Sequence, residues 1–130
     1  MVAANITWGS SSTDANINAS TIAASGSSAS AAISNSGQWA TECGLILTYN
    51  ASATKGAKVE ILRTNDGGTT YQADADGPYG FNLPFTANTT EHYVFTVMAD
   101  VSQFKINVIN LDTGQSITAA TLKTRQANWQ

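Results

Sequence analysis

The sequence predicts an all-β protein: an antiparallel β-sandwich of jelly-roll type, with seven or eight strands and an extended N-terminal arm. Three observations lead to this fold class. Segments of alternating apolar and polar residues recur every 8–12 residues or so. Turn residues such as Asn65–Gly68 separate these segments. No stretch of about twelve residues has the apolar spacing of a helix.

The first 38 residues are predicted to form the arm, and residues 39–130 the sandwich domain. The arm consists mostly of Ala, Ser, Asn, Thr and Gly, and Asp14 is the only charged residue among the first 41. A segment of this composition frays unless a neighbouring subunit holds it or a sheet accepts it as a strand, because it buries too little apolar surface to offset the entropy of ordering it.

Two weak strands are predicted inside the arm, at residues 20–24 and 29–34, with a turn at Gly26–Ser28 that would join them as a hairpin. A sandwich has open edge strands. We expect the arm to pair with the edge of a neighbouring copy, so that removing residues 1–30 would weaken assembly without unfolding the sandwich.

The strand signals become strong after Trp39. Residues 42–50 (ECGLILTYN) form an apolar run that ends in polar turn residues, which is typical of a buried strand. Residues 57–64 (AKVEILRT) alternate. Val59 and Ile61 are predicted to face the core, and charged residues, Arg63 among them, to lie nearer solvent.

A hairpin turn is predicted directly after this strand. Asn65–Gly68 can adopt the positive φ that tight turns need, and residues 69–73 (TTYQA) would be the returning strand. After a loop, residues 79–85 contain Pro84, which cannot donate within a ladder, so they are predicted to form a short edge segment.

Three further strands complete the sandwich. Residues 91–98 (EHYVFTVM) and 103–110 (QFKINVIN) both alternate between the two faces, and residues 117–125 (ITAATLKTR) form the last strand. Asp112-Thr113-Gly114 supplies the turn before it.

Composition excludes several classes of function. The 130 residues suit one domain. Only 12% are charged, about half the usual share, which fits surfaces that face other proteins. The net charge of −3 and six scattered basic residues predict no nucleic-acid partner. No apolar run is long enough to span a membrane and no signal peptide is recognisable, so we expect synthesis in a host cytoplasm.

Catalytic chemistry is weakly supported, and we expect a non-enzymatic protein without a cofactor. The single histidine, His92, lies within a strand, and the single cysteine, Cys43, precedes an apolar run typical of a buried thiol. A Cys43–His92 dyad is a remote alternative. Asp74–Gly77 has alternate carboxylates like the start of a calcium loop, but a turn explains the same residues.

The aromatic residues allow three interpretations. Trp and Tyr are enriched at subunit interfaces, and three residues are possible interface anchors: Trp8, Trp39 and Trp129. Sugar-binding sandwiches instead use aromatic rings beside carboxylates, and four residues could form such a cluster: Tyr71, Asp74, Asp76 and Tyr79. Packing of aromatic rings at the ends of the core is a third possibility.

A family resemblance rests on seven segments: WATE (39–42), LILTY (45–49), TKGAKVEI (54–61), DGGTTY (66–71), LPFT (83–86), YVFTV (93–97) and FKINV (104–108). In these, residues 39–125 resemble the small β-sandwich proteins encoded among the virion genes of tailed bacteriophages. No single segment is diagnostic, and a carbohydrate-binding module could have the same pattern.

The resemblance implies a virion protein without catalytic residues, either a capsid decoration or cement protein or a neck or tail accessory protein. It implies a homo-oligomer located in the virion, in contact with other virion proteins such as the major capsid protein or a neck or tail protein. The alternative is a carbohydrate-binding module that recognises host surface glycans.

Overall fold

The computed structural model describes residues 5–72, 79–100 and 102–129, with only the backbone of Trp129. The described residues contain no helix and eleven strands. Five short strands come from the arm: β1 (Ile6–Trp8), β2 (Ser12–Thr13), β3 (Ser20–Ile22), β4 (Ser27–Ala29) and β5 (Ile33–Ser34). The others are β6 (Ala40–Tyr49), β7 (Ala57–Thr64), β8 (Gly80–Asn82), β9 (Thr90–Met98), β10 (Gln103–Asn110) and β11 (Ile117–Trp129).

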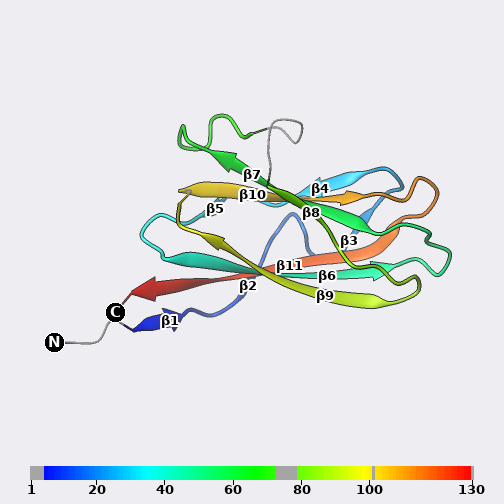
Figure 1. The fold of residues 1–130 in the computed structure, drawn as a ribbon, viewed down its shortest axis with the longest axis horizontal. Helices are drawn as coiled ribbons and strands as arrows, with labels where there is room; N and C mark the ends of the chain where they lie inside the picture. Colours follow the sequence, from blue (N-terminus) through cyan, green and yellow to red (C-terminus); the bar gives the residue numbers. More distant parts are fainter. Residues whose placement is uncertain (1–4, 73–78, 101, 130) are drawn as a thin grey trace.

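Two antiparallel sheets face each other, as Figure 1 shows. In the first, β1, β2 and β3 follow one another along one edge of β11, and β6 and β9 come next on its other side. The second has β4 and β5 along β10, followed by β7 and β8. When arm strands that share a neighbour are counted as one position, each sheet has four positions, in the strand order of a jelly roll. The predicted β-sandwich is confirmed.

The arm pairs with its own chain and not with a neighbour's edge. Ile6 lies opposite Trp129 and Ile22 opposite Ile117, both on β11, whereas Ala29 lies opposite Asn107 on β10. The predicted hairpin within the arm is therefore wrong, since the chain crosses from one sheet to the other between β3 and β4. The sequence left two ways to order the arm, a neighbouring subunit or a sheet that accepts it as strands. In the structure, the chain's own sheets accept it as strands.

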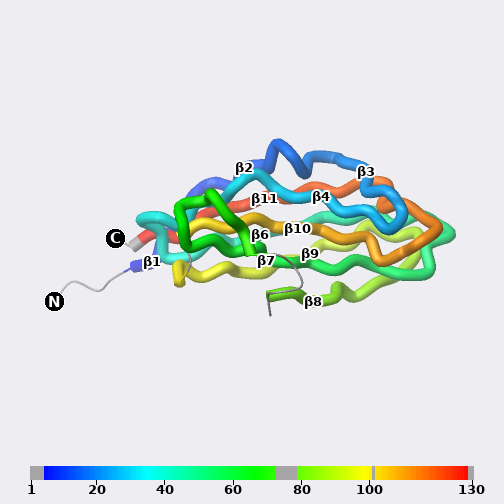
Figure 2. Tube along the Cα trace, turned by 90° about the horizontal axis from the view of Figure 1, so that it is seen from above, coloured from blue at the N-terminus to red at the C-terminus, as the bar shows by residue number. Residues whose placement is uncertain are grey.

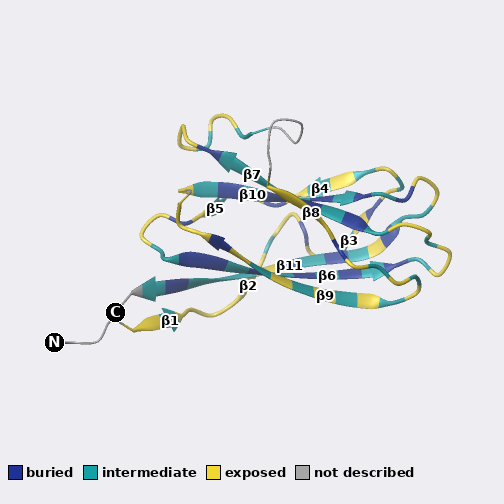
Figure 3. Cartoon of the chain, in the orientation of Figure 1, coloured by how far each residue is buried: buried dark blue, intermediate teal, exposed yellow. Residues whose placement is uncertain are grey.

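The core lies between the two sheets, where the buried residues of Figure 3 concentrate. Its largest fully buried side chains include Phe104, Leu45 and Leu122 from the long strands. Ile17 and Ile22 of the arm are equally buried, with 0% and 2% of their surface exposed. Removing residues 1–30 would take both out of the core, so the expectation that the sandwich survives this truncation does not fit the structure.

The two long margins of the sandwich differ. Seen from above, the arm strands β2 and β3 follow one margin, and β8 follows the other, beside β9 (Figure 2). The rings of Phe81 on β8 and Phe95 on β9 meet edge to face, with their centres 5.3 Å apart. These two rings close the margin between the sheets on the side away from the arm.

Candidate functional site

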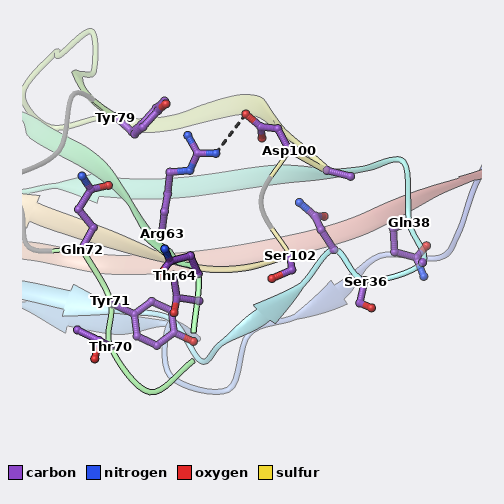
Figure 4. A pocket seen from close by; sticks show the side chains of 14 residues that line it. Ser36, Gln38, Arg63, Thr64, Thr70, Tyr71, Gln72, Tyr79, Asp100 and Ser102 are labelled. Carbon is purple, nitrogen blue, oxygen red and sulfur yellow. Dashed lines mark ion pairs between the residues drawn. The ribbon is translucent and has the colours of Figure 1, made fainter. Parts of the chain in front are cut away.

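One end of the sandwich carries a groove of about 1170 Å³ between three loops. The loops are 35–38, 64–72 and the connection from β9 to β10, and Figure 4 shows the groove from close by. Most of the described residues that line it have polar side chains: Asn35, Ser36, Gly37, Gln38, Arg63, Thr64, Asn65, Thr70, Tyr71, Gln72, Tyr79, Ala99, Asp100 and Ser102.

The loop after β7 is shaped by one carboxylate. Asp66 accepts hydrogen bonds from the backbone N–H groups of Thr69 and Thr70, at 3.0 and 2.9 Å, and from the hydroxyl of Thr64 at 2.8 Å. These bonds, above all the one from Thr70, lower the pKa of Asp66 to about 2.

The returning strand predicted at residues 69–73 is not formed over its described residues, 69–72. The described residues 69–72 form no strand, although the backbone N–H of Gln72 donates to the carbonyl of Arg63 on β7 at 2.7 Å. Asp66 takes the N–H groups of Thr69 and Thr70 that a strand would need, so the chain folds into a local turn instead of a ladder.

Arg63 is the central charge of the groove. It lies opposite Phe104 in the β7–β10 ladder, on the inner face of the sheet, and not nearer solvent as predicted. Its side chain leaves the core at the end of the sandwich and meets Asp100, with Nη2 and Oδ2 3.1 Å apart. Its guanidinium carbon lies 4.1 Å from the centre of the Tyr79 ring, which is a cation–π distance.

Tyr71 stands on the other wall of the groove. The ammonium nitrogen of Lys105 lies 4.5 Å from the centre of its ring. The preceding turn needs glycine, because Gly68 has a φ of +94° and a side chain at this position would overlap the side-chain oxygen of Gln103. Gly68 therefore lets the loop approach β10 closely enough to place Tyr71 beside Lys105.

Half of the predicted glycan cluster is placed by the structure. Tyr71 and Tyr79 line the same groove, each with a cation over its ring. Asp74 and Asp76 lie outside the described residues, and so does the calcium loop suggested at Asp74–Gly77. Among the described residues, no three His, Cys, Asp or Glu side chains come together in a way that could hold a metal ion.

The third wall was not predicted, and it depends on Asn35. This buried amide accepts the hydroxyl hydrogen bond of Thr41 at 2.5 Å and donates to the carbonyl of Met98 at 3.1 Å. Its backbone N–H donates to the carbonyl of Ser102 at 2.8 Å. Asn35 thus ties the loop 35–38 to β6 and β9 of the first sheet and to the connection between β9 and β10. The turn composition of Asn35–Gly37 was its only signal in the sequence.

The three tryptophans predicted as interface anchors lie at one end of the first sheet. Trp8 is opposite Ala127 in the β1–β11 ladder, and the backbone N–H of Trp39 donates to the carbonyl of Ala127 from the other side. The backbone of Trp129 pairs with Ile6. Trp8 is 39% exposed, and Arg125 lies over its ring at 4.8 Å. Whether these residues contact another subunit stays a prediction.

Cys43 and His92 do not form a dyad. Cys43 faces the core opposite Phe95, whereas His92 belongs to the outward-facing, exposed residues of β9. Burial of the thiol, with a smaller contribution from Glu42, raises the pKa of Cys43 to about 12. A cysteine acts as a nucleophile only as a thiolate, and this thiol stays protonated at neutral pH. Cys43 therefore serves as a residue of the hydrophobic core.

When this chain was compared with protein-family models, with curated proteins and with solved structures, none of them matched it. Within the described residues, no helix has the length and apolar character that crossing a membrane requires.

Proposed function

We propose that this protein is a non-enzymatic structural component of a bacteriophage virion, a capsid decoration or cement protein. A neck or tail accessory position is the alternative within the same class. The protein acts by contact: many weak, identical contacts between symmetry-related copies add up to a stable shell. The starting point is the resemblance of residues 39–125 to small virion β-sandwiches.

One observation carries the assembly role. The chain covers the outer edges of β11 and β10 with its own arm strands and the edge of β7 with β8, but β9 ends its sheet unpaired among the described residues. The covering strands are two or three residues long, whereas β9 has nine. A long exposed edge strand is a place where another chain can add a strand.

Exposed apolar side chains at one end of the first sheet also support a role in assembly. Ile6 and Trp8, both 39% exposed, stand on β1 beside β11. Large apolar side chains at the surface suit a contact with another protein better than a contact with water. These residues are the part of the arm that we expect to serve in assembly, while Ile17 and Ile22 hold the arm to the core.

The test is to locate the protein. An antiserum against the purified protein is applied to density-gradient fractions of phage particles from the source culture, with immunogold microscopy of the peak fraction. We expect the protein to co-sediment with the particles in many copies and the label to decorate the capsid. Label at the neck or tail selects the alternative position, and absence from washed particles contradicts the proposal.

A second candidate function, carbohydrate binding, is favoured by the groove. Tyr71 and Tyr79 can present ring faces to a sugar, while Arg63, Asp100 and Gln72 offer hydrogen-bonding groups for hydroxyls. The cations over the two rings fix their orientation before any ligand arrives.

A glycan array with the purified protein tests this second function. If a glycan binds in the groove, Tyr79→Ala should weaken its binding about tenfold or more, because the ring supplies stacking area. Val94→Thr, on the outer face of the first sheet away from the groove, is the matched control and should bind normally. Equal loss in both variants, or no glycan bound by the wild type, excludes this function.

A further inference from the structure

We propose that β9 is the edge through which two copies of this protein associate. The two β9 strands pair antiparallel about a two-fold axis at Val94, and the first sheet of one copy continues into the first sheet of the other. This inference rests on the proposed assembly role and names the partner of the uncovered edge, a second copy of the same chain.

The direction of the backbone groups on β9 follows from two hydrogen bonds. The N–H of Tyr49 donates to the carbonyl of Thr89 at 2.9 Å, and the N–H of Ala99 donates to the carbonyl of Trp39 at 3.1 Å. These pairs continue the β6–β9 register by one residue beyond each end, so the residues of each pair are directly opposed. Because hydrogen-bonded pairs alternate along an antiparallel ladder, odd-numbered residues of β9 point their N–H and C=O groups at β6, and even-numbered residues point theirs away.

The outward-pointing groups belong to Thr90, His92, Val94, Thr96 and Met98. All five residues are exposed, and Val94 is the most exposed large apolar residue among those described, at 69%. The carbonyl of Met98 accepts the hydrogen bond from Asn35, which ends the open stretch. From Thr90 to Thr96, no other described strand pairs with these groups.

This edge lacks most of the features that keep edges apart. Proteins protect exposed edges with lysine, proline, bulges, very short strands or inward-pointing charges, and of these β9 has only the carboxylate of Glu91. The segment Thr90–Met98 contains no lysine, arginine or proline, and its register with β6 runs without a shift. The arm and β8 supply short covering strands at the other three edges, so the absence of protection is specific to β9.

A second copy fits the edge because an antiparallel pair about a two-fold axis meets each donor with the matching acceptor of the same sequence. Val94 is the middle residue of Thr90–Met98, so only a register centred on Val94 overlaps the whole strand. In that register Val94 faces Val94 of the second copy, and His92 faces Thr96 of the second copy. About six backbone hydrogen bonds form across the central three pairs.

The register also avoids repulsion. The two imidazoles do not face each other, as they would in a pairing centred on His92. Directly opposed Val–Val pairs are favourable on a sheet face, whereas like charges in that position are not. The short strand β8 lies over the same margin in the second sheet, where it would face its counterpart in the second copy.

Cysteine cross-linking tests the register. Directly opposed, hydrogen-bonded residues have Cα atoms about 5.5 Å apart, a separation that a disulfide can span. The purified full-length Val94→Cys variant should therefore form a covalent dimer under mild oxidation with copper–phenanthroline. The matched control is Thr90→Cys on the same face of the same strand, whose two copies would lie about 27 Å apart and should stay uncoupled.

Sedimentation equilibrium over a concentration series tests the association itself. We expect the wild type to reach twice 13.6 kDa. Val94→Lys, which opposes two ammonium groups, should raise the dissociation constant about tenfold or more, whereas Val94→Thr should dimerise like the wild type. Circular dichroism and thermal melts confirm that each variant is folded.

Three results would overturn the inference. The first is equal cross-linking of the Val94→Cys and Thr90→Cys variants, and the second is a dimer that Val94→Lys leaves unchanged. The third is a wild type that stays monomeric at every concentration together with a Val94→Cys variant that does not cross-link. These outcomes are independent of the virion test. A protein that pairs through Val94 but is missing from particles contradicts only the proposed function, and a protein present in particles that does not pair through Val94 contradicts only this inference.

Discussion

The carboxylate of Asp14 accepts a hydrogen bond from the backbone N–H of Ala31 at 3.1 Å. The other oxygen of Asp14 accepts the N–H groups of Asn16 and Ile17, at 2.9 and 3.0 Å. The backbone N–H of Asp14 donates to the carbonyl of Leu122 on β11 at 2.8 Å. The only charge among the first 41 residues therefore links the half of the arm on the first sheet to the half that crosses to the second.

Replacing Asp14 should loosen the arm. Asp14→Ala leaves three backbone N–H groups without their acceptor, and we expect a loss of about 1–2 kcal/mol in the free energy of unfolding. Asp14→Asn keeps one acceptor oxygen and should lose less. Urea denaturation measures both, beside Ser11→Ala, an exposed arm residue that should change stability by less than about 0.5 kcal/mol. Equal midpoints for Asp14→Ala and Ser11→Ala would contradict the role of this carboxylate.

Two isoleucines of the arm should differ sharply in their contribution to stability. Ile17 is fully buried in the core, whereas Ile6 is 39% exposed. Ile17→Ala removes buried methyl groups and leaves a cavity, so we expect a loss of about 2–4 kcal/mol. Ile6→Ala should cost less than about 1 kcal/mol. Thermal or urea unfolding measures the loss of stability in the two variants. Similar losses would mean that the arm does not pack as described.

Acid stability should depend on Asp112. This buried carboxylate accepts the backbone N–H groups of Thr54, Lys55, Gly114 and Gln115, and those bonds, with Thr54 contributing most, lower its pKa well below 3.8. A pKa that is lower in the folded state stabilises the fold above the unfolded value of about 4, and this contribution is lost as the pH falls toward the folded value.

Asp112→Asn cannot titrate, so its free energy of unfolding should be lower than that of the wild type at pH 7 and should fall less between pH 5 and about 2. Asp66, whose pKa is lowered to about 2, acts in the same direction, and the double variant with Asp66→Asn should have the flattest profile. Urea titrations at a series of pH values measure the slopes. Parallel curves for wild type and Asp112→Asn would show that the bonded carboxylate is not the cause.

The thiol of Cys43 should be unreactive in the folded protein. It is completely buried and its pKa is raised to about 12, so almost no thiolate exists near pH 8. We expect a colorimetric thiol reagent to label it only as fast as the protein unfolds, and at once in concentrated urea. Rapid stoichiometric labelling of the native protein would mean that β6 opens far more readily than its place in the core suggests.

Local periodicity predicted the long strands well because it depends on which face of a sheet each residue occupies. Residues 57–64 and 103–110 were predicted as strands, and β7 and β10 occupy the same residues. Pairing partners could not be predicted in the same way. The turn at Gly26 suggested a hairpin, but Ile22 finds its partner at Ile117, and nothing local in the sequence specifies a neighbour so distant.

The candidate site was half predictable. Tyr71 and Tyr79 were predicted to lie together, and they line one groove. Arg63 was placed near solvent because charge was given more weight than alternation, although it has the same parity as Val59 and Ile61 and stands on the inner face. Asp100 and Asn35 were missed because their roles depend on loops that only the packed sandwich brings together.

The pairing of the arm with β11 has a consequence for synthesis. The strands β1, β2 and β3 leave the ribosome before β11 but can be completed only by it, since they have no other partner among the described strands. At about 5–20 residues per second, Ile22 waits roughly 5–20 s for its partner Ile117. An arm rich in Ser, Asn, Thr and Ala tolerates this delay, because it stays hydrated and offers few apolar residues for premature aggregation.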